Sequence, residues 1–270
     1  MSVFADQVFV SPGFSTAIRL EADELRVFAG EVEAQWLKRI ETAVPASADR
    51  FRADGIAGYH RHADADLHRS LWPKPERVLG EAAVARIKAL GFLDRIRQAL
   101  GPFRIAEMVW DNRTTPGTEE VYWRLVRPEA ADDVGPLHAD SWFHETVNGG
   151  VGQFPPHEVT VKLWIALVTE PGRNGLLVVP DSHVAGVGHS TVERDGTAKP
   201  QIGELPEGLQ PVLVEATPGT IIAFNDRLIH GGALNLGSRT RVSAEITLVL
   251  DRARVLRDVP GAAIAAATHA

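Results

Sequence analysis

The 270-residue sequence contains no cysteine. This absence excludes disulfide bonds, iron–sulfur clusters, cysteine nucleophiles and zinc sites built on thiolates. Any metal ion must therefore be bound by histidine, by carboxylates or by backbone oxygens.

The sequence also lacks a surplus of positive charge and any long apolar run. It has 28 basic and 35 acidic residues, a net charge of −7, and no basic block. Because binding to phosphate backbones needs excess Lys and Arg, we expect no nucleic-acid partner. The apolar runs are of strand length, far below the ~20 residues that span a membrane, and residues 1–14 do not resemble a signal peptide. We therefore expect a cytoplasmic protein without a membrane partner.

Residues 1–103 are predicted to be mostly helical. In residues 21–40, apolar side chains recur at helical spacing and would form one apolar face. Residues 81–90 and 92–100 are predicted as two further helices, divided by Gly91.

The segment 52–75 is rich in His, Asp, Gly and Pro. That composition favours a long surface loop. We accordingly expect His60, His62 and His68 to be solvated loop residues.

Residues 104–250 have the pattern of short β-strands. β-Branched and aromatic runs alternate with turn residues, and no strand–helix–strand order separates them. This favours an antiparallel barrel or jelly roll with the N-terminal helices packed on one side, all in one domain, followed by a tail at 251–270. The predicted strands are 121–126, 160–168, 176–179, 212–215, 220–224 and 240–250.

A candidate metal pair lies at His138 and Asp140. In a strand, residues i and i+2 project from the same face, so the two side chains would point together. The pair alone is a weak indicator, because a second triplet of the same form occurs at His62-Ala63-Asp64.

A second group of candidates lies downstream, at His230 and in the strand that follows it. That strand alternates, with one apolar face and one polar face that would either meet water or line a cavity inside a barrel. Arg241 and Ser243 on the polar face form a suitable pair for a carboxylate. The polar face consists of Arg241, Ser243, Glu245 and Thr247.

Two histidines and one carboxylate on an otherwise open metal suggest a non-heme iron(II) site. Three coordination positions would remain for dioxygen and a bidentate 2-oxo acid. The distal carboxylate of that acid would then need its own positive partner.

These motifs resemble the phytanoyl-CoA dioxygenase-like branch of the 2-oxoglutarate oxygenases. The resemblance covers roughly residues 121–250, with His230 lying 92 residues beyond His138 (230 − 138) and Arg241 another 11 beyond (241 − 230). Further matching pieces are residues 162–167, 174–183 and 218–232. The resemblance implies a double-stranded β-helix, the cupin-like jelly roll. It also implies iron ligands His138, Asp140 and His230, with the 2-oxoglutarate carboxylate on Arg241 and Ser243.

Lys162 and Trp164 share one face of a predicted strand. An inward lysine must find an anion, so Lys162 is a candidate for binding the oxo acid or an acidic substrate, unless its ammonium reaches water. Trp164 is either core or a wall of the cofactor pocket.

Candidate substrate contacts are Trp142 and His144, which directly follow the metal pair, and Tyr122 and Arg124 on the preceding strand. For the first two, plain loop packing is an equally good interpretation.

We expect the protein to hydroxylate a small polar metabolite and to release succinate and CO2. Within the family that the sequence resembles, halogenases have a small residue in place of the carboxylate, so Asp140 favours hydroxylation over halogenation, with desaturation and ring closure left open. Two alternatives stay open: a redox-neutral cupin-type metal enzyme such as an isomerase or epimerase, and a catalytically silent binding barrel.

Overall fold

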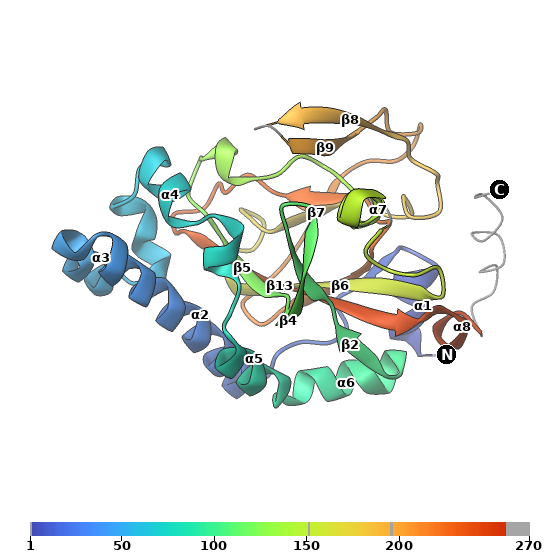
Figure 1. Cartoon of the computed structure of the whole chain (residues 1–270), viewed down its shortest axis with the longest axis horizontal. Helices are drawn as coiled ribbons and strands as arrows, with labels where there is room; N and C mark the ends of the chain where they lie inside the picture. Colours follow the sequence, from blue (N-terminus) through green and yellow to red (C-terminus); the bar gives the residue numbers. More distant parts are fainter. Residues whose placement is uncertain (1, 151, 195–196, 258–270) are drawn as a thin grey trace.

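The computed structural model describes residues 2–150, 152–194 and 197–257 (Figure 1). Helices make up most of the N-terminal part and lie along one side of a central β-structure. Their bounds are α1 Val3–Phe9, α2 Ala22–Ala43, α3 Ala48–Asp54, α4 Ala65–Leu71, α5 Glu81–Lys88 and α6 Gly91–Leu100. Two further helices, α7 Asp140–Gly150 and α8 Arg252–Val255, occur later in the chain.

Helix α2 has the apolar face that the sequence predicted. It begins with a capping box between Glu21 and Glu24, and its buried apolar side chains recur every four residues. The helices α5 and α6 confirm the other two predictions. The buried apolar residues of α2 are Phe28, Val32, Trp36 and Ile40.

The prediction of a long loop at 52–75 is wrong. The segment forms the end of α3, the 3-10 helix η2 (Ile56–Arg61), α4 and the first half of the 3-10 helix η3 (Lys74–Arg77). Its polar residues act within these turns; Asp64, for example, caps α4 by accepting from the Leu67 backbone N–H at 2.9 Å. The sparse apolar side chains Phe51, Tyr59 and Leu71 anchor the turns in the core.

The three histidines of this segment are half-buried, contrary to the expectation of solvated loop residues, and each has a partner inside the fold. His60 contacts the Thr240 hydroxyl at 3.0 Å, and His62 contacts the Asp54 carboxylate at 2.7 Å. His68 lies 3.6 Å from Asp133, with its side chain 17% exposed.

Two antiparallel sheets form the β-structure. The larger has the order β1-β11-β6-β13-β2, with β5 also paired to β13, and the smaller has the order β10-β7-β12. The strands of the larger sheet are β1 Phe14–Ser15, β2 Phe103–Ile105, β5 Val121–Val126, β6 Glu158–Val168, β11 Ile221–Asn225 and β13 Arg241–Asp251. Those of the smaller are β7 Leu176–Val178, β10 Val212–Val214 and β12 His230–Gly232.

Two hairpins, which the sequence did not predict, extend from the sheets. They are formed by β3 Glu107–Trp110 with β4 Arg113–Glu119, and by β8 His189–Arg194 with β9 Thr197–Ile202. The architecture is the predicted mainly-β jelly roll with flanking helices, and each strand predicted from the sequence is present within two residues of its expected ends.

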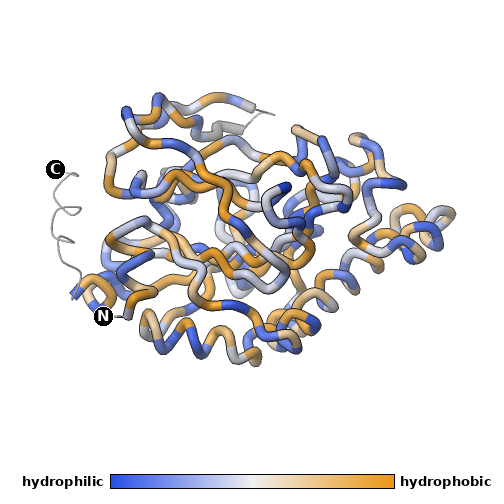
Figure 2. Tube along the Cα trace, turned by 180° about the vertical axis from the view of Figure 1, so that it is seen from behind, coloured by the Kyte–Doolittle hydropathy of each residue, from blue (hydrophilic) through white to orange (hydrophobic). Residues whose placement is uncertain are grey.

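The outer face of the larger sheet packs against the N-terminal helices. On β13 the apolar residues of this face belong to the same buried cluster as the apolar stripe of α2; they are Val242, Ala244, Ile246 and Leu248. Figure 2 shows the matching alternation of hydrophilic and hydrophobic residues along the helices. The opposite face of β13 is polar and nevertheless buried, so it lines the interior rather than water.

The predicted tail at 251–270 is described only as far as residue 257, and residues 258–270 lie outside the described part. Among the helices of the described residues, none has the length and apolar character needed to cross a bilayer.

Candidate metal centre

His138 and His230 are brought together by backbone pairing. The N–H of each residue donates to the carbonyl of the other at 2.9 Å, which forms an isolated antiparallel bridge between the segment before α7 and strand β12. Residues that exchange both hydrogen bonds lie directly opposite each other. The two imidazole rings are consequently only 4.5 Å apart between centroids.

Asp140 is the first residue of α7, so the prediction that it shares a strand with His138 is wrong in its geometry. The chain turns into the helix at this point, and a carboxylate at a helix N-terminus is favoured by the helix dipole. The turn still directs Asp140 toward the two histidines.

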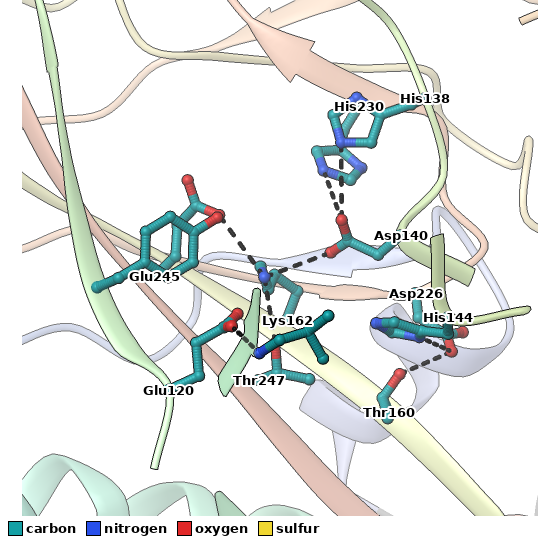
Figure 3. A network of polar contacts seen from close by, with 12 residues as sticks. Glu120, His138, Asp140, His144, Thr160, Lys162, Asp226, His230, Glu245 and Thr247 are labelled. Carbon is teal, nitrogen blue, oxygen red and sulfur yellow. Dashed lines mark hydrogen bonds and ion pairs between the residues drawn. The ribbon is translucent and has the colours of Figure 1, made fainter. Parts of the chain in front are cut away.

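The three side chains converge on one point (Figure 3). The Nε2 atoms of His138 and His230 lie 3.6 and 3.7 Å from Oδ1 of Asp140, and the three ligand atoms all lie within 4.8 Å of one another. This is the two-histidine, one-carboxylate donor set that suits a divalent iron with open positions.

Both imidazoles are held in the tautomer that a metal requires. Nδ1 of His138 lies 2.8 Å from the carbonyl of Pro136, and Nδ1 of His230 lies 2.9 Å from that of Leu228. Because a carbonyl only accepts, each Nδ1 must carry the proton, which leaves the lone pair of each Nε2 free. Burial lowers the pKa of His230 to about 4, so this ring is neutral near pH 7.

The second oxygen of Asp140 faces Lys162. Nζ of Lys162 lies 3.7 Å from Asp140 Oδ2, 3.6 Å from Glu245 Oε2 and 3.1 Å from the Thr247 hydroxyl. Burial opposes ionisation of Asp140, but Lys162 and the two histidines outweigh burial and hold its pKa well below the usual value. Lys162, expected to contact the oxo acid or substrate, thus has the carboxylates of Asp140 and Glu245 as its partners.

Arg241 and Ser243 lie on the same inner face of β13, and both are buried, at 2% and 0% exposure. Nη1 of Arg241 donates to the Gly175 carbonyl at 2.5 Å, whereas its Nε and the Ser243 hydroxyl have no partner. Burial lowers the pKa of Arg241 to about 10, so it stays charged at neutral pH. A buried guanidinium without a carboxylate is costly and fits an anionic ligand.

The three candidate ligands and Arg241 line one cavity between the two sheets. Trp164 and Phe224 form apolar walls, with the Phe224 ring 4.4 Å from that of His230 and the Arg241 guanidinium 5.7 Å from that of Trp164. The remaining lining is Arg124, Asp133, Val134, Gly135, Leu176, Gly231, Gly232 and Glu245. Of the substrate-contact candidates, Arg124 therefore reaches the cavity.

The other three candidates do not line this cavity. Trp142 is buried and stacks on His189 of β8 at 4.5 Å between ring centroids. His144 lies 4.0 Å from Asp226. Successive helical residues point in different directions. Asp140 is the α7 residue that supplies a candidate ligand atom, and the Phe143 ring packs edge-on against the His138 ring at 5.2 Å between centroids. Tyr122 donates its hydroxyl to Glu245.

Glu245 was placed on the polar strand face by the sequence, but its role was not predicted. Its carboxylate accepts from Arg124 at 2.7 Å and lies beside Lys162. Burial opposes its ionisation, yet Arg124 and Lys162 together lower its pKa to about 2. The strand register explains the cluster, since Glu245 lies opposite Tyr122 of β5 and Trp164 of β6.

Comparison with known proteins agrees with this architecture. The model of the family described as "Phytanoyl-CoA dioxygenase (PhyH)" matches residues 9–243. No curated protein sequence matches the chain.

Among solved structures, the non-heme monooxygenase ThoJ in complex with nickel has a TM-score of 0.53 and 14% identity, and the match covers 92% of this chain and 79% of that one. EctD from S. alaskensis with 2-oxoglutarate and 5-hydroxyectoine has a TM-score of 0.50 and 19% identity, covering 92% and 76%. At such low identities the two solved structures show only a shared fold. The family assignment rests on the family model, which covers most of the sequence. The chain therefore belongs to the phytanoyl-CoA dioxygenase family of iron(II)- and 2-oxoglutarate-dependent oxygenases.

Proposed function

We propose that this protein hydroxylates a small polar metabolite, with iron(II) bound by His138, Asp140 and His230. One observation carries the proposal: the buried guanidinium of Arg241, whose Nε has no partner, lines the same cavity as the three ligand residues, and the partnerless Ser243 hydroxyl lies on the same face of β13 as Arg241. A metal site alone would not require that cation.

The donor set supports this chemistry. Two imidazole Nε2 atoms and one carboxylate would leave coordination positions for the 1-carboxylate and keto oxygen of 2-oxoglutarate and for dioxygen. The bound iron would supply the activation of dioxygen. One oxygen atom of O2 enters succinate, with loss of CO2, and the other replaces a substrate C–H by C–OH.

The residues of the chain orient the reactants. Arg241 and Ser243 would hold the distal carboxylate of 2-oxoglutarate, and Lys162 would hold the outer oxygen of Asp140 so that the inner oxygen faces the metal. Trp164 and Phe224 exclude water from the same space.

Two other functions fit less well. A redox-neutral cupin-type enzyme does not need Arg241 and Ser243 for the distal carboxylate of an oxo acid, and a silent binding barrel does not need the three ligand atoms of His138, Asp140 and His230. A halogenase would need space at the metal where this chain has the carboxylate of Asp140.

The test is an anaerobic titration of iron(II) and 2-oxoglutarate into the purified protein. We expect the weak visible charge-transfer band of an iron–oxo-acid chelate, absent in His230→Ala and weakened in Arg241→Ala. The exposed Arg239→Ala is the control and should leave the band intact. Iron binding without a band would favour the redox-neutral enzyme, and absence of metal binding would contradict the assigned ligands.

A further inference from the structure

A second, larger cleft adjoins the metal cavity. It has a volume of about 550 Å³, within the range of small-molecule sites. It shares Arg124 and the segment 133–135 with the lining of the metal cavity, so the two spaces meet at these residues. Among its other walls are residues of α4, η3 and β3, elements that have no role in the proposed metal chemistry.

Four arginines line this cleft, and three of them have a carboxylate partner. Arg127 donates to both oxygens of Asp133 at 2.8 and 2.9 Å, and Arg124 donates to Glu245 at 2.7 Å. Arg69 lies 3.3 Å from Asp66 on the exposed side of α4. These three charges are therefore already balanced.

Arg77 is the exception. Its Nε donates to the Trp72 carbonyl at 2.9 Å and its Nη1 to the Trp123 carbonyl at 3.0 Å, and within the described part of the chain no carboxylate lies at ion-pair distance from it. The two carbonyls hold the guanidinium in place without neutralising it. Burial lowers the pKa of Arg77 to about 10, so the charge persists at neutral pH.

An unbalanced, half-buried cation is costly unless an anion approaches it. The one other acid of the lining, Asp132, is exposed, and its repulsion of an incoming anion is screened by water and salt. The cleft can therefore accept one additional negative charge.

The cleft also has an exposed aromatic wall. Trp110 of β3 lines it and is 47% exposed, although tryptophan is normally well buried. A cleft lined by an exposed indole and by a cation is suited to a ligand with an apolar body and an anionic end.

We propose that the substrate is a small carboxylate whose anion pairs with Arg77 and whose apolar body lies along Trp110. From there the C–H bond to be oxidised would extend past Arg124 to the metal cavity. A single guanidinium matches a single negative charge, which favours a monocarboxylate. This inference rests on the proposed function, because it places the oxidised carbon at the iron site.

The test compares acids with their neutral isosteres. The protein is loaded with nickel(II) and 2-oxoglutarate, so that Arg241 is already occupied, and is titrated calorimetrically with phenylacetate, indole-3-acetate and hexanoate, each beside its carboxamide. We expect at least one acid to bind about tenfold more tightly than its amide, as a charge-assisted contact should provide. That preference should vanish in Arg77→Gln, return in part in Arg77→Lys and persist in the control Arg50→Ala, an exposed arginine of α3.

Equal binding of every acid and amide, or a preference that survives Arg77→Gln, would overturn the proposal. If Arg77→Gln does not fold, Trp110→Ala tests the same cleft at an exposed position and should weaken the aromatic acids more than hexanoate. Failure of the proposed function is distinguishable, since 2-oxoglutarate itself would then not bind to the nickel-loaded protein.

Discussion

The two oxygens of the Asp140 carboxylate have different surroundings. Oδ1 faces the two imidazoles, and Oδ2 faces the ammonium of Lys162, which is 6% exposed. A charge that orients a metal ligand from behind typically contributes tenfold to a hundredfold in metal affinity. Lys162 is thus a positioning residue for the proposed iron site.

We predict that Lys162→Met lowers nickel(II) affinity about tenfold to a hundredfold. Without the ammonium, Asp140 and Glu245 are two buried carboxylates, and the pKa of Asp140 rises, so protons compete with the metal. Calorimetric titration measures the effect. Lys74→Met is the matched control, because Lys74 pairs with Glu120 at 2.6 Å and contacts no candidate ligand. Equal losses in the two variants would indicate a general charge effect instead.

At the scale of the element, the two faces of strand β13 have different roles, one in stability and the other in the proposed chemistry. Its outer face packs on the helical layer, and its inner face presents Arg241, Ser243 and Glu245 to the interior. Because successive strand residues alternate between faces, a change on one face need not disturb the other.

We predict that Ile246→Ala destabilises the protein by about 2–5 kcal/mol, as expected for truncation of a fully buried aliphatic side chain. Ile246 is 0% exposed and lies opposite Leu163 of β6 and Val121 of β5. The affinity for 2-oxoglutarate should not change. Chemical denaturation and ligand titration measure the two effects. Leu236→Ala, at a 55% exposed position, should cost little; a weakened 2-oxoglutarate affinity in folded Ile246→Ala would contradict independence of the faces.

The conformation of the segment that forms helix α7 was predicted wrongly from the sequence. The sequence around Asp140 was interpreted as a strand followed by a rim loop, which made Trp142 and His144 candidate substrate contacts. In the helix neither side chain lines the metal cavity, and Trp142 stacks on His189 of β8; a contact of either residue with the substrate stays a prediction.

At the scale of the whole molecule, His68 lies where the helical layer meets the barrel. It belongs to α4, its ring lies 5.7 Å from that of Tyr59, and its Nε2 lies 3.6 Å from Asp133 of the segment after β5. Burial lowers its pKa to about 4, although Asp133 acts in the opposite direction. The contact is therefore made by a neutral imidazole at physiological pH.

We predict that His68 contributes to acid sensitivity. The unfolded chain binds the His68 proton below about pH 6.5, whereas the folded protein does so near pH 4. Stability therefore falls as the pH decreases between these values, by at most about 1.4 kcal/mol per pH unit for one proton. Denaturant unfolding from pH 7.5 to 4.5 measures the slope, which should be shallower in His68→Leu. Parallel slopes would show that the ring already titrates normally in the folded state.

The local periodicity of the sequence was sufficient to predict most of the helices and strands. The apolar stripe of α2 and the two faces of β13 depend on residues within one element, so spacing alone predicted them, and the order of motifs predicted the family and the candidate ligands. Segment 52–75 was misjudged because its helices are short and anchored by a few apolar residues whose burial depends on distant parts of the chain.

Contacts between distant residues were decided only by the tertiary structure. The bridge that places His138 beside His230 joins residues 92 positions apart (230 − 138). Whether Lys162 faces an oxo acid or Asp140, and whether Arg77 has a carboxylate partner, depends on register and packing. The sequence shows which residues carry a charge, but the packing of strands and helices determines which residue each charge pairs with.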